Sequence, residues 1–288
     1  MYSEISYLSD DGLRLYARDY PAASGPARLP VICIHGLTRN SADFEDVAPW
    51  IAGQGRRVIA VDVRGRGNSD YDPQPDRYTP AVYANDIVKL AHDLGIARAV
   101  FVGTSMGGLI TMTLALRKSE LIAAAVLNDV GPALSPRGLA RIAAYTGRGE
   151  EFTSWPQAAD YIRSINDVAF PANTGDDWER WARRAFREDE QGKLVMRYDA
   201  NIAVPIRANK LKAASMVAQF AFRRLARRRP TLLIRGGLSD LIEQEQVNAM
   251  RAAAPRMQFA EIPDIGHAPM LSEPAAQEAL RGFLDSVD

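Results

Sequence analysis

The sequence predicts an α/β fold in which a mostly parallel sheet is covered by helices and interrupted by a helical insertion. Two observations carry this prediction. Short apolar runs of strand length alternate with helix-length segments, and the alternation stops at Gly131-Pro132 and resumes at Thr231. Strands covered on both faces appear in a sequence as short continuous apolar runs, and their alternation with helices indicates a parallel sheet.

The elements follow one another in a regular order. Two early strands are predicted around the turn Asp10-Asp11-Gly12, and a loop rich in Pro, Ala and Gly follows at 21–30. The predicted strands are 4–8, 13–20, 31–34, 57–61, 99–102, 123–127, 231–235 and 257–262. The predicted helices are 43–53, 80–94, 106–117, 244–252 and 274–285.

The segment from 133 to 225 is helical in character and breaks the strand rhythm. We therefore expect an α/β core made of residues 1–132 and 226–288, with 133–225 as a helical cap. An arginine-rich run, Arg223-Arg224 with Arg227-Arg228-Arg229, ends this segment. It would suit an anionic partner, but we favour a solvated helix end, because cations suit a helix C-terminus.

Composition excludes several classes of protein. Lys+Arg and Asp+Glu both number 35 in the 288 residues, so the basic excess of a nucleic-acid binder is missing. The single cysteine, Cys33, excludes an internal disulfide and a multi-cysteine metal site, and three histidines leave little for a histidine-rich one. We expect no cofactor, no metal and a small-molecule substrate.

The chain shows no sign of export or of membrane insertion. The N-terminus lacks a basic start followed by an apolar run, and no stretch approaches the roughly 18 apolar residues of a membrane span. We expect a cytoplasmic protein that makes no contact with membranes. The oligomeric state is not predicted.

The strongest functional signal is Gly103-Thr104-Ser105-Met106-Gly107, which fits the pattern G-x-S-x-G. It lies directly between a predicted strand and an apolar helix, where a sharp turn would present the Ser105 hydroxyl above the sheet. The alternative is a serine that only caps the helix, with glycines for packing. We expect Ser105 to be a nucleophile.

A serine nucleophile needs a base, and the base needs a carboxylate to orient it. His267 is the candidate base, because it lies on a loop after the last predicted strand, although a turn histidine without a role would look the same. Asp240 follows the strand at 231–235 and is the preferred acid. Asp129 follows the strand at 123–127 and is its rival, unless it only caps local backbone NH groups.

The developing oxyanion needs backbone donors. We expect the NH of Met106, which follows the nucleophile, and the NH of Leu37, which follows the flexible residue Gly36. His35 is expected to brace this loop, so that His35 and Gly36 both border the substrate. In the cap, Trp155 and Trp181 are the candidate substrate contacts, although at least half of the cap aromatics are expected to pack only against one another.

At this point the chain resembles the α/β-hydrolase superfamily over almost its full length. The resemblance rests on His35-Gly36, Asp62–Asp70, Gly103–Gly108, Arg235–Asp240 and Gly266-His267. It implies an eight-stranded, mostly parallel sheet with an inserted cap, and a triad of Ser105, Asp240 and His267.

The resemblance implies a hydrolase that cleaves a small carboxylic ester or lactone. Dehalogenases and epoxide hydrolases of this fold carry an aspartate where this chain has Ser105, which argues against both. A carbon–carbon hydrolase of ring-cleavage products shares the serine triad, but such enzymes often have tryptophan where this chain has Ala268. A ligand receptor that has lost the chemistry is the other alternative.

Overall fold

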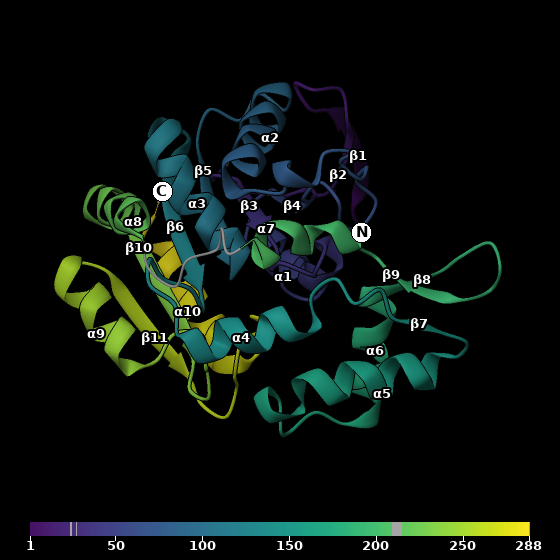
Figure 1. Ribbon diagram of the computed structural model, residues 1–288. Coiled ribbons are helices and arrows are strands. Elements are labelled where there is room, and N and C mark those ends of the chain that lie inside the picture. The colour runs from purple at the N-terminus through teal and green to yellow at the C-terminus, as the bar shows by residue number, and fades with distance from the viewer. Residues whose placement is uncertain (24, 27, 209–214, 288) are drawn as a thin grey trace.

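The central feature of the structure is one eight-stranded sheet that is parallel except at its N-terminal edge (Figure 1). The computed structural model describes residues 1–23, 25–26, 28–208 and 215–287. The strand order is β1-β2-β4-β3-β5-β6-β10-β11, and β1 and β2 form the antiparallel edge. The strands are β1 (Ser3–Leu8), β2 (Arg14–Tyr20), β3 (Val31–Ile34), β4 (Val58–Asp62), β5 (Ala99–Thr104), β6 (Ile122–Asn128), β10 (Thr231–Gly236) and β11 (Gln258–Ile262). The predicted fold class is thus confirmed.

Helices cover both faces of the sheet because alternate residues of its central strands point to opposite sides. Val100 and Val102 of β5 pack with α1 (Val47–Ala52) and α10 (Pro274–Asp285), whereas Phe101 packs on the other face. That other face is covered by α2 (Pro80–Asp93), α3 (Met106–Arg117), α8 (Met216–Arg228) and α9 (Gln244–Ala253). The two apolar layers hold the carboxyl ends of the strands at a common edge.

The segment from the end of β6 to α7 lies at that edge and combines helices with a small sheet. Its helices are α4 (Pro136–Tyr145), α5 (Trp155–Asn166), α6 (Gly175–Ala185) and α7 (Val204–Arg207). Its antiparallel sheet joins β7 (Glu151–Phe152), β9 (Leu194–Met196) and β8 (Phe186–Glu188). The short 3-10 helices of the chain are η1 (Ser41–Phe44), η2 (Pro75–Arg77), η3 (Ser119–Leu121), η4 (Asp167–Ala169) and η5 (Ala200–Ala203). The sequence did not predict the small sheet, because strands of two or three residues are too short to show an alternating pattern.

The predicted domain boundary falls inside a helix. Helix α8 passes through residue 225 and packs against α3, so it belongs to the helical layer over the sheet. The division into a core and a cap therefore stays a prediction, and residues 209–214 of that cap lie outside the described residues. The predicted helix at 43–53 is divided between η1 and α1.

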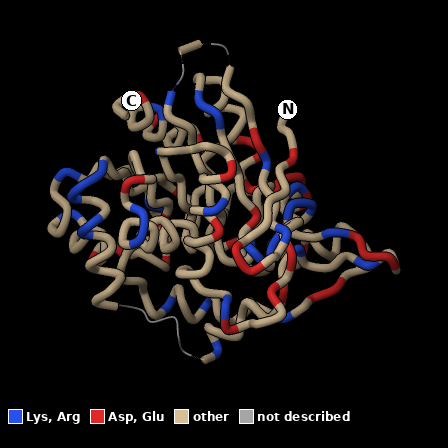
Figure 2. Tube along the Cα trace, turned by 90° about the horizontal axis from the view of Figure 1, so that it is seen from above, with Lys and Arg blue, Asp and Glu red and all other residues tan. Residues whose placement is uncertain are grey.

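The arginine-rich run ends α8, and its basic residues gather at one end of that helix, on the left of Figure 2. Arg224 donates to Ala115 O (2.7 Å) and Arg227 donates to Ala253 O (2.9 Å). These carbonyls belong to the last turns of α3 and α9, where helix acceptors otherwise lack partners. This arrangement agrees with the structural interpretation of the run. In the part of the chain that the structure describes, no helix is long and apolar enough to cross a bilayer.

Candidate active site

Ser105 lies in a strained turn between β5 and α3. Its φ of 51° and ψ of −113° are outside the regions that most residues adopt. A Cβ at Gly103 would lie 2.5 Å from the Gly107 carbonyl carbon, and one at Gly107 would lie 2.0 Å from Ile34 O. Both positions therefore require glycine, as the G-x-S-x-G pattern predicts. Ser105 NH donates to Asn128 O (2.9 Å), which ties the turn to the end of β6.

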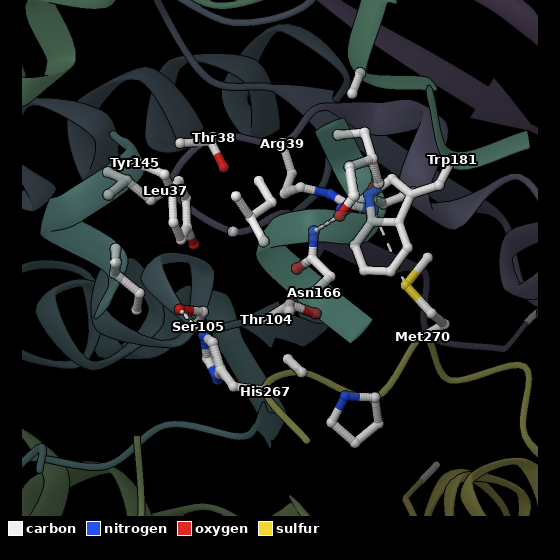
Figure 3. Close-up of a pocket in the computed structure, with 18 of the residues that line it drawn as sticks. Leu37, Thr38, Arg39, Thr104, Ser105, Tyr145, Asn166, Trp181, His267 and Met270 are labelled. Atoms are coloured by element: carbon white, nitrogen blue, oxygen red, sulfur yellow. Dashed lines mark hydrogen bonds and ion pairs between the residues drawn. The ribbon is translucent and has the colours of Figure 1, made fainter. Parts of the chain in front are cut away.

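His267 contacts the serine on one side and a carboxylate on the other. Its Nε2 lies 2.9 Å from Ser105 Oγ, and its Nδ1 lies 2.7 Å from Asp129 Oδ2. With the ring proton on Nδ1 donated to the carboxylate, Nε2 accepts the Ser105 hydroxyl. Figure 3 shows Ser105 and His267 side by side at the edge of a cavity. The sequence-based expectation that Ser105 and His267 lie within proton-transfer reach is met by this geometry.

Asp129 is held in place by a loop that follows a neighbouring strand. Its φ is 55° and it is fully buried. Gly236 NH donates to Oδ1 (2.9 Å), while the Ser239 hydroxyl donates to Oδ2 (2.6 Å), the same oxygen that faces His267. Three donors thus compensate the buried carboxylate, which would otherwise be costly to desolvate.

The sequence-based preference for Asp240 as the partner of His267 needs correction. Its carboxylate makes a two-point ion pair with Arg141 of α4, at 2.6 and 2.7 Å. Burial acts to raise the pKa of the Asp240 carboxyl, whereas the Arg141 guanidinium acts to lower it. The lowering effects together are larger, so the pKa of Asp240 lies below its ordinary value. Asp240 therefore faces α4, and its rival Asp129 occupies the position beside His267.

The backbone NH groups of Leu37 and Met106 border Ser105. A Cβ built on Gly36 would lie 3.7 Å from Ser105 Cβ, so this loop passes close to the nucleophile. Among the described residues, neither NH donates a hydrogen bond to another protein group. Both positions suit the predicted role as oxyanion donors.

The loop that carries Leu37 is held by hydrogen bonds from Arg66 and around His35. Arg66 Nε donates to Leu37 O (2.9 Å). His35 Nε2 accepts Val63 NH (3.1 Å), and its Nδ1 lies 2.7 Å from Gly36 O. Burial lowers the pKa of His35 to about 4, so the ring is neutral at physiological pH. His35 is fully buried and lines no cavity beside Ser105, so its place is that of a brace and the expected contact with substrate is wrong.

Three cavities meet around Ser105 and His267. The smallest, of about 80 Å³, is lined by Ser105 and His267 and by apolar side chains such as Trp181; we name it the polar cavity after Arg39 and Asn166, which also line it (Figure 3). The aliphatic cavity, of about 550 Å³, is lined by Ser105, Leu37 and Met106 and by apolar side chains of the cap. The arginine groove, also of about 550 Å³, is lined by His267, Arg137, Arg141, Arg148 and Asp240 among others.

The two tryptophans predicted to contact substrate are placed differently. Trp181 lines the polar cavity, where Arg39 lies 4.2 Å from its ring centre (Figure 3). Trp155 lines none of these three cavities; it packs within the cap, with the Arg183 guanidinium 4.5 Å from its ring centre. Sequence spacing does not distinguish an aromatic that faces a cavity from one that packs inside the cap.

Sequence reasoning missed Asn128, which precedes Asp129. Its amide nitrogen donates to Thr104 Oγ1 (3.0 Å) and to Pro269 O (2.7 Å). It therefore joins the residue before Ser105 to the loop after His267. Its position at the end of a predicted strand was the available signal. Among the described residues no group of three or more His, Cys, Asp or Glu side chains is arranged to hold a metal ion.

Comparison with known proteins gives consistent matches. The model of the alpha/beta hydrolase fold family matches residues 30–274. A 3-hydroxybutyrate-oligomer hydrolase of Cupriavidus necator is 35% identical, over 94% of this chain and 93% of that protein. An sn-1-specific diacylglycerol lipase ABHD11 of Mus musculus is 25% identical, over 88% and 80%. The crystal structure of an alpha/beta hydrolase from Novosphingobium aromaticivorans is 41% identical, covers 99% of both chains and has a TM-score of 0.91.

Proposed function

The chain belongs to the alpha/beta hydrolase family, and within it we propose a serine hydrolase that cleaves a small carboxylic ester or lactone through an acyl-enzyme. One observation carries the proposal: the hydrogen-bonded series from Ser105 Oγ through His267 to Asp129. A hydroxyl, an imidazole and a buried carboxylate in this order form the arrangement that activates a serine. Relatives named as hydrolase, esterase and lipase agree with a hydrolase of ester bonds.

In the first half of the reaction, Ser105 Oγ attacks the carbonyl carbon of the substrate while its proton passes to His267 Nε2. Asp129 keeps the ring oriented and stabilises its positive charge. The NH groups of Leu37 and Met106 donate to the oxyanion. The tetrahedral intermediate then collapses, and His267 gives its proton to the oxygen of the leaving alcohol, so that an acyl-Ser105 ester remains.

In the second half, His267 takes a proton from a water molecule that attacks the acyl carbon. The second tetrahedral intermediate uses the same two backbone donors. When it collapses, His267 returns the proton to Ser105 Oγ and the carboxylic acid leaves. No step requires a metal or an organic cofactor. We further propose a small-molecule substrate and a cytoplasmic site of action.

The names of the relatives support an ester substrate, but they differ in which ester is cleaved. The protein of Cupriavidus necator is named for oligomers of 3-hydroxybutyrate, which are esters of a short hydroxy acid, and the lipase of Mus musculus is named for diacylglycerol. Both names support cleavage of the ester bond of a substrate whose acyl group is aliphatic. Such substrates need the nucleophile, base and oxyanion donors that surround Ser105.

The decisive experiment is active-site labelling with a fluorophosphonate probe, followed by mass spectrometry. We expect a covalent adduct on Ser105 and hydrolysis of a short-chain aryl ester, both lost in Ser105→Ala without loss of the fold by circular dichroism. An unlabelled, inactive wild-type protein would favour a ligand receptor. Turnover of a ring-cleavage dienoate in place of esters and lactones would favour the carbon–carbon hydrolase. Full ester hydrolysis by Ser105→Ala would refute the serine mechanism.

A further inference from the structure

The two cavities that touch Ser105 differ in which side of the site they occupy. The aliphatic cavity is lined by Ser105 together with Leu37 and Met106, but His267 is not among its lining residues. The polar cavity is lined by both Ser105 and His267, and the arginine groove by His267. Ser105 therefore lies between two sides of the site: the aliphatic cavity on the side without His267, and the polar cavity and the arginine groove on the side with His267.

This asymmetry assigns the two halves of an ester. In the serine mechanism proposed above, on which this inference rests, His267 must give a proton to the leaving oxygen, so the alcohol lies on the His267 side. The acyl group then extends to the other side. We infer that the aliphatic cavity binds the acyl chain of the substrate, that this chain is an unsubstituted alkyl chain of medium length, and that the alcohol is small.

The lining of the aliphatic cavity selects an alkyl chain. Among its walls are side chains from α3, the following cap segment and the region of α7, including Leu109, Leu134, Leu139, Ile142, Ile202 and Ile206. Its two tyrosine hydroxyls are already engaged. Tyr78 donates to Asp199 (2.5 Å) and accepts Asp72 NH (2.8 Å), and the Tyr83 oxygen accepts from Arg66 (2.9 Å). A chain with hydroxyl or ester groups would bury them here at a cost, whereas methylene groups gain by leaving water.

The volumes set the size of each half. An apolar protein cavity of about 150 Å³ is large enough to hold benzene, so about 550 Å³ that opens to solvent accommodates an acyl chain of about eight to ten carbons. Of the two cavities on the His267 side, only the polar cavity is also lined by Ser105, and its volume of about 80 Å³ leaves room for only a small group beside the nucleophile. It is bordered by Arg39, which pairs with Asp43 at 2.7 Å, and by Asn166. The substrate thus carries a long apolar chain on the acid and a small group on the alcohol.

Two isomeric esters test the assignment directly. Ethyl octanoate and octyl acetate have the same atoms, but the first places the long chain in the acyl half and the second in the alcohol half. We expect kcat/KM for ethyl octanoate to exceed that for octyl acetate at least tenfold. In a series of aryl esters with one leaving group, kcat/KM should rise from acetyl to octanoyl, by up to about fourfold for each methylene group buried.

A bulky substitution in the cavity sharpens the test. Leu139 is a partly buried residue of α4, so Leu139→Trp adds volume inside the cavity without disturbing the sheet. We expect kcat/KM for the octanoyl ester to fall about tenfold or more, and the ratio of kcat/KM for the octanoyl ester to that for the acetyl ester to fall with it. Leu8→Trp is the matched control, because Leu8 is exposed on β1 and lines none of the three cavities; its chain-length profile should equal that of the wild type.

The outcomes separate this inference from the proposed function. Faster cleavage of octyl acetate, a flat chain-length profile, or a dimer of 3-hydroxybutyrate cleaved better than ethyl octanoate would overturn the acyl assignment while Ser105 still reacts with the fluorophosphonate. An unchanged profile in a folded Leu139→Trp would also overturn it. Loss of labelling and of all ester hydrolysis in the wild type would instead remove the serine mechanism itself.

Discussion

Two neighbouring loops at the carboxyl edge of the sheet each carry an aspartate, and the two carboxylates have different partners. Asp129 follows β6, is fully buried and faces His267. Asp240 follows β10, is partly exposed and pairs with Arg141 of the cap. The end of β10 and the loop after it nevertheless position the other carboxylate, because Gly236 NH and the Ser239 hydroxyl both donate to Asp129. Position beyond a strand end is therefore not sufficient; the donors that surround a carboxylate decide which group it serves.

The largest test of this comparison exchanges each carboxylate for an amide. Asp129→Asn should lower kcat by about 10⁴-fold, because the amide donates to the imidazole and favours the wrong tautomer. Asp240→Asn should stay within about tenfold of the wild type. Both variants are measured with the same aryl ester, with folding checked by thermal unfolding. The reverse ranking, with Asp240→Asn the crippled variant, would show that the acid is the one first preferred from the sequence.

The next test removes the donor that the loop after β10 gives to Asp129. Ser239→Ala should lower kcat about tenfold, because the carboxylate loses a charge-assisted hydrogen bond that orients it. The carboxylate should then attract the protonated imidazole more strongly, and the acid limb of the kcat/KM profile should move to higher pH. The variant leaves unchanged the other charged or titratable side chains that line the arginine groove beside His267: Arg137, Arg141, Tyr145, Arg148, Asp167, Asp240 and Glu243.

Ser239→Thr is the matched control for that experiment, because it keeps the hydroxyl. It should restore the wild-type pH profile. A loop that was merely disturbed would lower the activity of both variants without moving the acid limb. An unmoved profile in Ser239→Ala would show that this hydroxyl does not act through Asp129.

The smallest effect concerns the ion pair between Asp240 and Arg141. Its side chains are 18% and 30% exposed, so solvent screens it, and Asp240→Asn should lower the free energy of unfolding by about 1 kcal/mol at pH 7. The pKa of Asp240 is lowered in the folded state, so this stabilisation is complete above the unfolded pKa and is lost as pH falls. Urea unfolding should show the difference narrowing from about pH 5 towards pH 3. A constant difference would show that the pair acts through packing.

Local patterns predicted the sheet, Ser105 and His267, because each depends on a short stretch of sequence. Apolar runs mark the strands, and the glycines around Ser105 are required by close backbone contacts that any such turn would make. The choice of acid is not local. Asp129 and Asp240 both follow neighbouring strands, and either one preserves the chain order of serine, aspartate and histidine.

The partner of each carboxylate comes from a part of the chain that is distant from that carboxylate, about a hundred positions away in both cases. Arg141 lies in α4, about a hundred positions before Asp240 in the sequence, and its ion pair with that carboxylate depends on how α4 packs over the sheet. The same holds for the aromatic residues of the cap. Trp181 reaches a cavity and Trp155 does not, a difference set by the packing of α5 and α6 against each other.

The insertion between β6 and β10 has a consequence for the order in which the chain becomes active. Ser105 and Asp129 precede the insertion, whereas Ser239 and His267 follow it. A growing chain that has emerged only as far as the insertion holds a serine with no base and a carboxylate with no anchor. In the serine mechanism proposed above, hydrolysis can start only after His267 has left the ribosome and β10 has docked beside β6, so the active site forms only after the insertion has been made.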